Sequence, residues 1–177
     1  LQTKLLKILK TCSEFNTDRF MSKILLVYTG GTIGMIKNPE TGALTAFNFD
    51  ELLSNIPELK LLEHEISTVS FEEPVDSSDM DTTDYVKLAD LIEENFEDYD
   101  GFVVLHGSDT MSYTASAISF MFENLKKPII FTGSQLPIGD LRTDAKENLI
   151  TSIQLAGLKE NGKTVIREVG LYFEYKL

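Results

Sequence analysis

Short apolar runs alternate along this chain with longer segments in which apolar residues recur at helical spacing. The runs Ile24–Val27, Gly101–Leu105 and Pro128–Phe131 are too short for helices and carry no charged or polar side chain, as is typical of buried strands. From residue 66 onward, strands alternate with helical segments, an order that predicts parallel strands with helices on both faces of the sheet. We therefore expect an α/β fold, built as a three-layer sandwich around a mainly parallel sheet.

The remaining elements follow from periodicity and from capping signals. Alternating polarity predicts a strand at Ile66–Phe71, and a last apolar run predicts another at Val169–Phe173. Asp81 followed by Asp84 has the spacing of a helix N-cap with its capping box. The whole order is Rossmann-like. Helical segments are expected at residues 49–56 (ending near Pro57), 82–96, 111–122 and 149–156.

The composition is that of a soluble globular domain. The 177 residues suffice for one domain of ordinary size, and 42% of them are hydrophobic. A net charge of −12 argues against nucleic acid and against an anionic membrane surface as partners. The single cysteine, Cys12, excludes an internal disulfide and fits a reducing compartment, although a secreted protein poor in cysteine would look the same. His64 and His106 lack metal-ligand spacing, so we expect no metal.

Residues 1–20 differ from the rest of the chain. Leucine and isoleucine alternate there with Lys4, Lys7 and Lys10, without the continuous apolar stretch or the cleavage site of a signal peptide. Because Met21 is a plausible translation start, we expect residues 1–20 to be an extension, either upstream sequence or a leader added by cloning. Such an extension would be disordered or form a short helix, and a membrane-surface helix is the alternative. The domain itself is expected to span residues 21–177.

A glycine-rich turn, Tyr28–Gly34 (YTGGTIG), directly follows the first apolar run. Glycine lets the backbone turn sharply and lets a ligand approach, and the turn holds the Thr32 hydroxyl at the end of a strand. Pro39 lies too near for a helix to start at once, so the turn does not fit the dinucleotide-binding fingerprint. Residues 35–47 are expected to form a flap or hairpin over Thr32. Thr32 is either a nucleophile or an ordinary turn residue.

Three further turns rich in small hydroxyls and glycine follow predicted strands, at Asp76–Asp79, Gly107–Thr110 and Thr132–Gln135. Because the carboxyl ends of parallel strands meet at one edge of a sheet, we expect these turns to surround a crevice together with the Thr32 turn. Such a crevice suits a small polar ligand that carries an amine and a carboxylate. The candidate residues are Gly31, Thr32, Asp76, Ser77, Ser78, Ser108, Asp109, Ser134 and Gln135.

Each candidate also has a purely structural interpretation. Ser108–Asp109 has residue types favoured as the N-cap of the following helix. Asp76–Asp79 can be solvated loop carboxylates, and Ser134–Gln135 can be a loop that only leads into a helix. His106, at the end of an apolar run, is more often a hydrogen-bonded structural histidine than a base. No serine–histidine–aspartate order indicates a base for Thr32, and the lysines lie on helices or in loops away from the predicted edge.

The motifs Tyr28–Gly34 and His106–Thr110 (HGSDT), together with Asp76–Met80 and Thr132–Gln135, resemble those of the bacterial L-asparaginases, and of the cytoplasmic type I branch in particular. The resemblance extends from about Lys23 to the end of the chain. It implies hydrolysis of L-asparagine to L-aspartate and ammonia without a cofactor. It also implies a homo-oligomer, a dimer or tetramer, with sites near the subunit contacts.

The resemblance assigns a role to each matching residue. Thr32 matches the nucleophile that forms an acyl-enzyme. Ser108 and Asp109 match a threonine–aspartate pair, in which the hydroxyl takes part in proton transfer or water activation and the carboxylate binds the α-amino group. The segment Asp76–Ser78 matches the one that holds the substrate's α-carboxylate and amine.

The chain departs from the family pattern in three ways. Ser108 replaces a threonine but keeps the hydroxyl, and Ala43 follows Gly42 where the family's flap commonly carries a tyrosine. Tyr28 is not assumed to replace that tyrosine. The family's catalytic lysine lies beyond Val169–Phe173, so we expect an asparaginase N-terminal domain whose C-terminal domain is missing and which hydrolyses asparagine poorly.

Two other functions remain open. One is a non-catalytic module that binds asparagine or aspartate. The other is the asparaginase-like component of an archaeal tRNA-dependent amidotransferase, which carries an extra N-terminal domain for which a 20-residue leader is too short.

Overall fold

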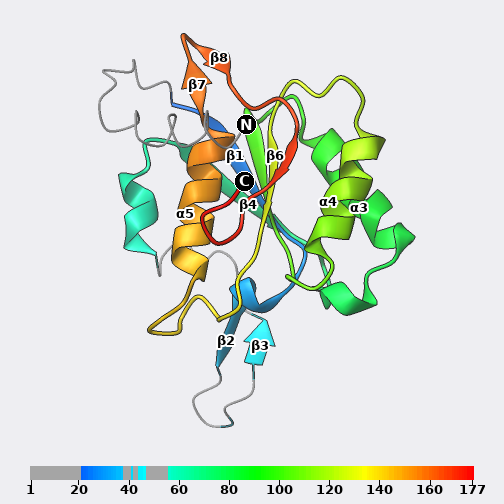
Figure 1. The fold of residues 1–177 in the computed structure, drawn as a ribbon, viewed down its shortest axis with the longest axis vertical. Coiled ribbons are helices and arrows are strands. Elements are labelled where there is room, and N and C mark those ends of the chain that lie inside the picture. Colours follow the sequence, from blue (N-terminus) through cyan, green and yellow to red (C-terminus); the bar gives the residue numbers. More distant parts are fainter. Residues whose placement is uncertain (1–20, 38–40, 42–43, 47–55) are drawn as a thin grey trace.

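A single five-stranded sheet forms the centre of the molecule (Figure 1). The computed structural model describes residues 21–37, 41, 44–46 and 56–177. All four neighbouring strand pairs are parallel, which confirms the predicted parallel sheet, and strand ends differ from the predicted ones by at most two residues. In spatial order the strands are β4 (Glu65–Ser70), β1 (Lys23–Tyr28), β5 (Gly101–Leu105), β6 (Ile129–Thr132) and β9 (Val169–Leu171).

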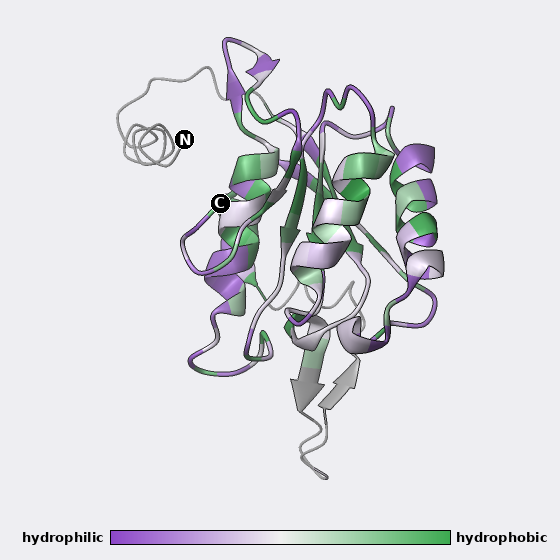
Figure 2. Ribbon diagram, turned by 45° about the vertical axis from the view of Figure 1, so that its right-hand side comes forward, coloured by the Kyte–Doolittle hydropathy of each residue, from purple (hydrophilic) through white to green (hydrophobic). Residues whose placement is uncertain are grey.

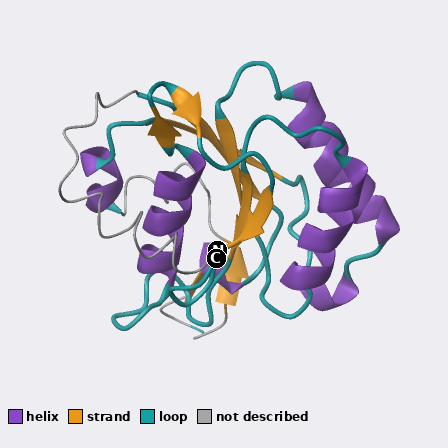
Figure 3. Ribbon diagram, turned by 45° about the horizontal axis from the view of Figure 1, so that its top comes forward, coloured by secondary structure: helices purple, strands orange, loops and turns teal. Residues whose placement is uncertain are grey.

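Helices cover both faces of this sheet, which confirms the three-layer sandwich (Figure 3). Helices α3 (Thr82–Glu94) and α4 (Met111–Met121) lie on one face, and α5 (Ala145–Ala156) lies on the other (Figure 1). Successive strand residues point to opposite faces, so Ile24 and Leu26 pack in the α5 core, whereas Leu25 and Val27 pack in the α3–α4 core. The helices turn apolar faces toward the sheet (Figure 2).

The two helices on the α3–α4 face begin differently. Asp81 accepts the N–H of Thr83 at 2.7 Å, and the Asp84 carboxylate accepts the N–H of Asp81 at 3.2 Å, which confirms the predicted capping box. Helix α4 begins at Met111, after an N-cap residue, Thr110, that makes no side-chain cap bond. The N-cap interpretation of Ser108–Asp109 is therefore wrong, because the helix starts after these two residues.

The connections contain hairpins and short 3-10 helices. Strands β2 (Met35–Lys37) and β3 (Leu44–Ala46) pair antiparallel, as the hairpin prediction for residues 35–47 requires, but a position over Thr32 stays a prediction. The helix expected at residues 49–56 lies outside the described residues except for its last position, and so does the extension at residues 1–20. Pro57 starts the 3-10 helix η2 (Pro57–Leu61), where its missing N–H costs nothing.

A small hairpin after α5 was not predicted. It joins β7 (Lys159–Glu160) to β8 (Lys163–Thr164) through Asn161 and Gly162, which both have positive φ, 51° and 72°. Each strand of this hairpin has only two residues, which are too few to show the alternating polarity that would predict a strand.

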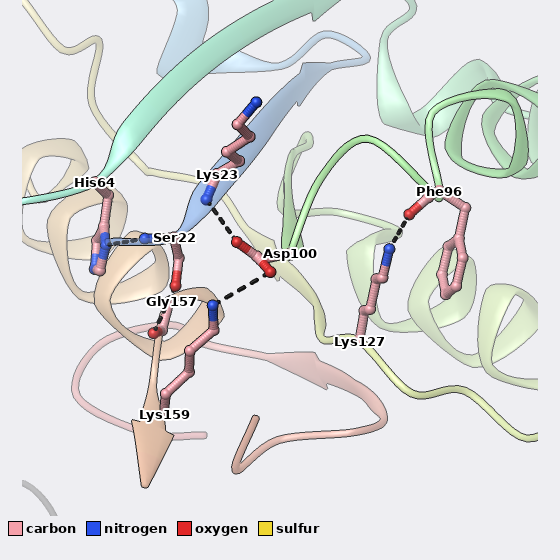
Figure 4. Close-up of polar contacts among 8 residues, drawn as sticks. All are labelled: Ser22, Lys23, His64, Phe96, Asp100, Lys127, Gly157 and Lys159. Atoms are coloured by element: carbon pink, nitrogen blue, oxygen red, sulfur yellow. Dashed lines mark hydrogen bonds and ion pairs between the residues drawn. The ribbon is translucent and has the colours of Figure 1, made fainter. Parts of the chain in front are cut away.

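The edge of the sheet at the amino ends of its strands is closed by polar contacts (Figure 4). The Asp100 carboxylate accepts the Lys23 N–H at 2.9 Å and pairs with the Lys159 ammonium at 3.2 Å. Partial burial raises the pKa of Asp100, but these two partners outweigh it and hold the pKa below its ordinary value. Nearby, the Lys127 ammonium donates to the Phe96 carbonyl and lies 4.7 Å from the centre of that ring. The opposite edge, at the carboxyl ends, carries the glycine-rich turns.

Candidate active site

The strand order reverses next to β1. The chain leaves β1 for β4 on one side and returns to β5 on the other, so the carboxyl ends of β1 and β5 form a switch point of the kind where α/β sheets bind ligands. Each strand is followed there by a turn: the 3-10 helix η1 (Thr32–Gly34) after β1, η3 (Ser77–Asp79) after β4, and Gly107–Thr110 after β5. Three of the four turns predicted to share an edge thus follow three adjacent strands.

Glycine allows these turns to touch. A Cβ placed on Gly31 would lie 2.5 Å from the Gly107 nitrogen, and a Cβ placed on Gly107 would lie 2.5 Å from the Ser77 hydroxyl oxygen. Gly31 also has φ of 88°, a conformation that L side chains rarely adopt. The turns that follow β1, β4 and β5 therefore meet at one edge of the sheet, where the backbones of Gly31 and Gly107 are in contact and the Ser77 side chain packs on Gly107.

The residues that follow Thr32 anchor its turn in the hydrophobic core. Ile33 is fully buried in the α5 core, and Gly34 lies on the ring of Tyr28, where an added Cβ would approach the ring carbons to 2.4 Å. The Tyr28 hydroxyl lies 3.2 Å from the Gly31 carbonyl and donates to it. Thr32, between these anchored residues, is half-buried. The neighbours of Thr32 are thus held in the core while Thr32 itself is left partly accessible.

The turn after β4 is organised by Asp76. The Asp76 carboxylate accepts the Ser78 N–H at 3.0 Å and the Ser78 hydroxyl at 2.9 Å. These two bonds, the backbone one first, hold the pKa of Asp76 below its ordinary value, so the exposed carboxylate is ionised at neutral pH. Ser77 is buried against Gly107, and its carbonyl accepts a 2.7 Å hydrogen bond from the Thr110 hydroxyl. The carboxylate therefore both orders its own turn and presents a negative charge.

The fourth predicted turn, Thr132–Gln135, contacts the third. The Gln135 side-chain amide donates to the Ser108 hydroxyl over 3.3 Å. Ser134 is buried and donates to the Leu136 carbonyl at 2.7 Å, so its hydroxyl serves the loop itself. Asp144 accepts the N–H groups of Gln135 at 2.9 Å and of Leu136 at 3.1 Å. This loop is thus held by Asp144 in a position from which Gln135 reaches the Ser108 side chain.

A cavity of about 310 Å³ opens beside Ser108 and Asp109. Of the described residues, Thr32 and Asp76–Ser78 do not line it. It is lined by Ser108, Asp109, Met111, Ser112, Gln135, Leu171 and Phe173.

His106 lies under these turns as a buried residue. Its Nδ1 donates to the Gly107 carbonyl at 2.7 Å, and burial lowers its pKa despite this contact, so the ring is neutral with the proton on Nδ1. The ring lies 6.1 Å from that of Phe131, centre to centre. Its position fits the interpretation of His106 as a structural, hydrogen-bonded histidine.

Two contributors to the site were not singled out from the sequence. Thr110 links two turns through Ser77, and Asp144 supports the loop that carries Gln135. A threonine before a helix and an aspartate before another helix are ordinary capping signals. The fold shows that the Thr110 side chain contacts the turn after β4 and that the Asp144 side chain contacts the far end of its own loop.

Candidate metal sites and membrane-spanning helices are absent from residues 21–37, 41, 44–46 and 56–177. There, no group of three or more histidine, cysteine, aspartate and glutamate side chains is arranged to hold a metal ion. None of the helices in those ranges has the length and apolarity needed to cross a membrane. A second open cavity, of about 690 Å³, lies on the β7–β8 hairpin and is bordered by residues such as Lys163 and Arg167.

Comparison with known proteins identifies the family. The profile of the family described as "Asparaginase, N-terminal" matches residues 23–177. The chain belongs to the asparaginase family. L-asparaginase 1 of Escherichia coli K12 is 43% identical over 155 residues, which are 87% of this chain and 44% of that protein. The crystal structure of L-asparaginase I from Vibrio cholerae matches with a TM-score of 0.76 and 44% identity, over 87% of this chain and 45% of that one.

Asparaginase-type domains also occur in relatives with other names. The 60 kDa lysophospholipase of Mus musculus is 40% identical over 176 residues, 88% of this chain and 30% of that protein. A glutamyl-tRNA(Gln) amidotransferase component of Pyrococcus abyssi is 38% identical over 139 residues, 77% of this chain and 31% of that protein. The chain spans less than half the length of each of these relatives, and the expected type I asparaginase resemblance is confirmed.

Proposed function

We propose that this asparaginase-family chain is the nucleophile-bearing half of an L-asparagine amidohydrolase. The observation that carries the proposal is the meeting of the Thr32, Ser77 and Gly107 turns at the switch point of the sheet. A half-buried hydroxyl, exposed carboxylates and backbone N–H groups are gathered there. This set of groups suits a small zwitterion with a carboxamide side chain.

In the proposed reaction the Thr32 hydroxyl attacks the side-chain amide carbon of asparagine. Its proton passes to a base, the amide nitrogen takes up a proton and leaves as ammonia, and water then hydrolyses the acyl ester to aspartate and free threonine. N–H groups of the glycine-rich turn are proposed to stabilise the oxyanion. The family resemblance gives the base's role to a lysine beyond residues 1–177.

The substrate's charged groups would be held by the other turns. Asp109, exposed at the rim of the 310 Å³ cavity, is proposed to bind the α-ammonium group. Asp76–Ser78 is proposed to bind the α-amine and α-carboxylate through its side chains and N–H groups. Ser108, oriented by the Gln135 amide, is proposed to relay a proton or activate water. Gly31, Ser134 and Gln135 support these positions.

The wider properties follow from the same family assignment. We propose hydrolysis without a metal or other cofactor, a cytoplasmic location, and a homo-oligomer, a dimer or tetramer, in the full-length protein. The acidic charge of −12 supports the absence of nucleic-acid and membrane partners.

Two forms of the protein test the proposal. The 177-residue chain and a chimera carrying the segment that follows the matched region of the E. coli relative are assayed for ammonia release from asparagine. We expect activity in the chimera, a loss of about 10³-fold or more on Thr32→Ala, and very slow turnover in the 177-residue chain. Undiminished activity of the Thr32→Ala chimera would exclude Thr32 as the nucleophile.

The two alternatives predict other results. A module that only senses asparagine or aspartate would bind aspartate in calorimetry, with and without Thr32→Ala, while the chimera released no ammonia. An amidotransferase component, the alternative to which the similarity to the P. abyssi protein is relevant, would release ammonia at an appreciable rate only with a partner and a charged tRNA present.

A further inference from the structure

Tyr28 is the last residue of β1 and lies directly beneath the turn that holds Thr32. It is 1% exposed, although it carries a hydroxyl that must be matched by polar partners when buried. One of these partners is the Gly31 carbonyl at 3.2 Å, which belongs to the peptide unit that joins Gly31 to Thr32. The hydroxyl therefore contacts the backbone immediately before the proposed nucleophile.

The ring of Tyr28 supports the other end of the same turn. An added Cβ on Gly34 would lie 2.4 Å from two ring carbons, Cε2 and Cζ, and 2.8 Å from the hydroxyl oxygen. Gly34 donates its own N–H to the Gly31 carbonyl at 3.3 Å, so that oxygen receives bonds from the turn and from Tyr28. One side chain thus contacts both ends of the three-residue 3-10 helix Thr32–Gly34.

The Tyr28 hydroxyl stays protonated, and so remains a hydrogen-bond donor, at neutral and moderately alkaline pH. Burial raises the pKa of the Tyr28 phenol to about 12, so it stays a donor wherever an amidase would work. A separation of 3.2 Å is long for an O–H···O bond, and its contribution is correspondingly modest. The ring packing and the hydroxyl together, rather than the hydroxyl alone, fix the turn.

We propose that Tyr28 is a positioning residue for Thr32, whose hydroxyl and ring hold both ends of the Thr32–Gly34 turn so that the threonine hydroxyl faces the substrate. The inference rests on the proposed function of Thr32 and adds a residue to it. Tyr28 does not touch the substrate. Because it acts through the backbone of the nucleophile, its loss should slow the chemical step more than it weakens binding.

Three variants of the asparagine-hydrolysing chimera test this. Tyr28→Phe removes the hydroxyl and keeps the ring, Gly34→Ala displaces the ring, and Tyr172→Phe is the matched control. Tyr172 is a second buried tyrosine of the same core, and its hydroxyl donates to Glu147 at 2.6 Å, away from the turn. All are assayed well below the melting temperature of each variant.

We expect Tyr28→Phe to lower kcat about three- to tenfold with KM changed less than about twofold, and Gly34→Ala to lower kcat further. Tyr172→Phe should lower the melting temperature without lowering kcat. Equal kcat values for Tyr28→Phe and Tyr172→Phe, or a change confined to KM, would overturn the proposal.

A second readout does not need activity. Amide hydrogen exchange in the 177-residue chain should quicken at residues 31–34 in Tyr28→Phe and stay unchanged there in Tyr172→Phe. If the unsubstituted chimera releases no ammonia, the proposed function fails and this exchange result alone decides the role of Tyr28. Unchanged exchange at residues 31–34 in Tyr28→Phe would then overturn the inference.

Discussion

The Thr110 hydroxyl donates a 2.7 Å hydrogen bond to the Ser77 carbonyl, and this bond connects turns that follow two non-adjacent strands. Strands β4 and β5 are separated by β1, so the bond spans the end of the strand that carries the Thr32 turn. Ser77 is 3% exposed, which leaves little water to replace a lost partner. The bond therefore helps to keep the turns around the candidate site together.

Thr110→Val tests that bond, because valine keeps the shape of threonine and removes the donor. We expect the free energy of unfolding to fall by about 1–2 kcal/mol, since the Ser77 carbonyl loses a partner where little water reaches it. Urea titration measures this, and aspartate binding should weaken as well. Thr110→Ser keeps the hydroxyl and serves as the control, so equal stability of the two variants would contradict the prediction.

Gly31→Ala tests the contact between the turns after β1 and β5. The added methyl would stand 2.5 Å from the Gly107 nitrogen in a backbone with φ of 88°. We expect a loss of about 1–3 kcal/mol in the free energy of unfolding from backbone strain, and loss of activity in the chimera. Gly139→Ala is the control, because no heavy atom lies within 4 Å of a Cβ there. A Gly31→Ala protein as stable as the control would refute the close packing.

Asp144→Ala tests the support of the Gln135 loop. The substitution removes the acceptor for the N–H groups of Gln135 and Leu136 and for the Asn148 amide at 3.3 Å. Hydrogen bonds to a charged group contribute more than neutral ones, so thermal or urea unfolding should report a loss of about 1.5–3 kcal/mol. Asp98→Ala, on an exposed part of the chain, should change stability little. Similar losses of unfolding free energy in the two variants would show that the hydrogen bonds of Asp144 to this loop do not stabilise the fold.

The pH dependence of stability should depend on His106. Burial lowers its pKa in the folded chain, whereas the unfolded chain titrates near 6.5. Below about pH 6.5 the unfolded state binds a proton at His106 that the folded state does not. The contribution of neutral His106 to the free energy of unfolding is therefore complete above that pH, and it is lost as the pH falls toward the folded-state pKa.

Urea titrations at pH 5.5, 6.5 and 7.5 measure this contribution. We expect unfolding free energy to rise with pH in the unsubstituted chain and to rise less steeply in His106→Asn, which keeps a side-chain donor. His64, whose pKa burial also lowers, accounts for part of the remaining slope. Identical slopes with and without His106 would contradict the assignment.

Much of the fold could be predicted from local patterns. The apolar runs at Ile24–Val27 and Gly101–Leu105 have the length and composition of buried strands, and the capping box at Asp81 marks the first residue of α3. The alternative interpretation of Ser108–Asp109 as a helix cap is wrong because several residues before a helix can have capping side chains, and the sequence does not show which of them the backbone uses. The β7–β8 hairpin is too short for periodicity to indicate.

For the candidate site, the sequence by itself determined the types of side chain at the strand ends and the glycines that permit tight turns there, because these depend on neighbouring residues along the chain. Which turns touch was decided only by the tertiary structure. The order β4-β1-β5 brings Gly31 against Gly107 and Gly107 against Ser77, across separations of tens of residues. The contact of Thr110 with Ser77 also depends on the tertiary structure, because the two residues follow different strands and are 33 positions apart in the chain. Tyr28 and Asp144 contact nearby residues of the chain, but capping and turn propensities do not specify those partners.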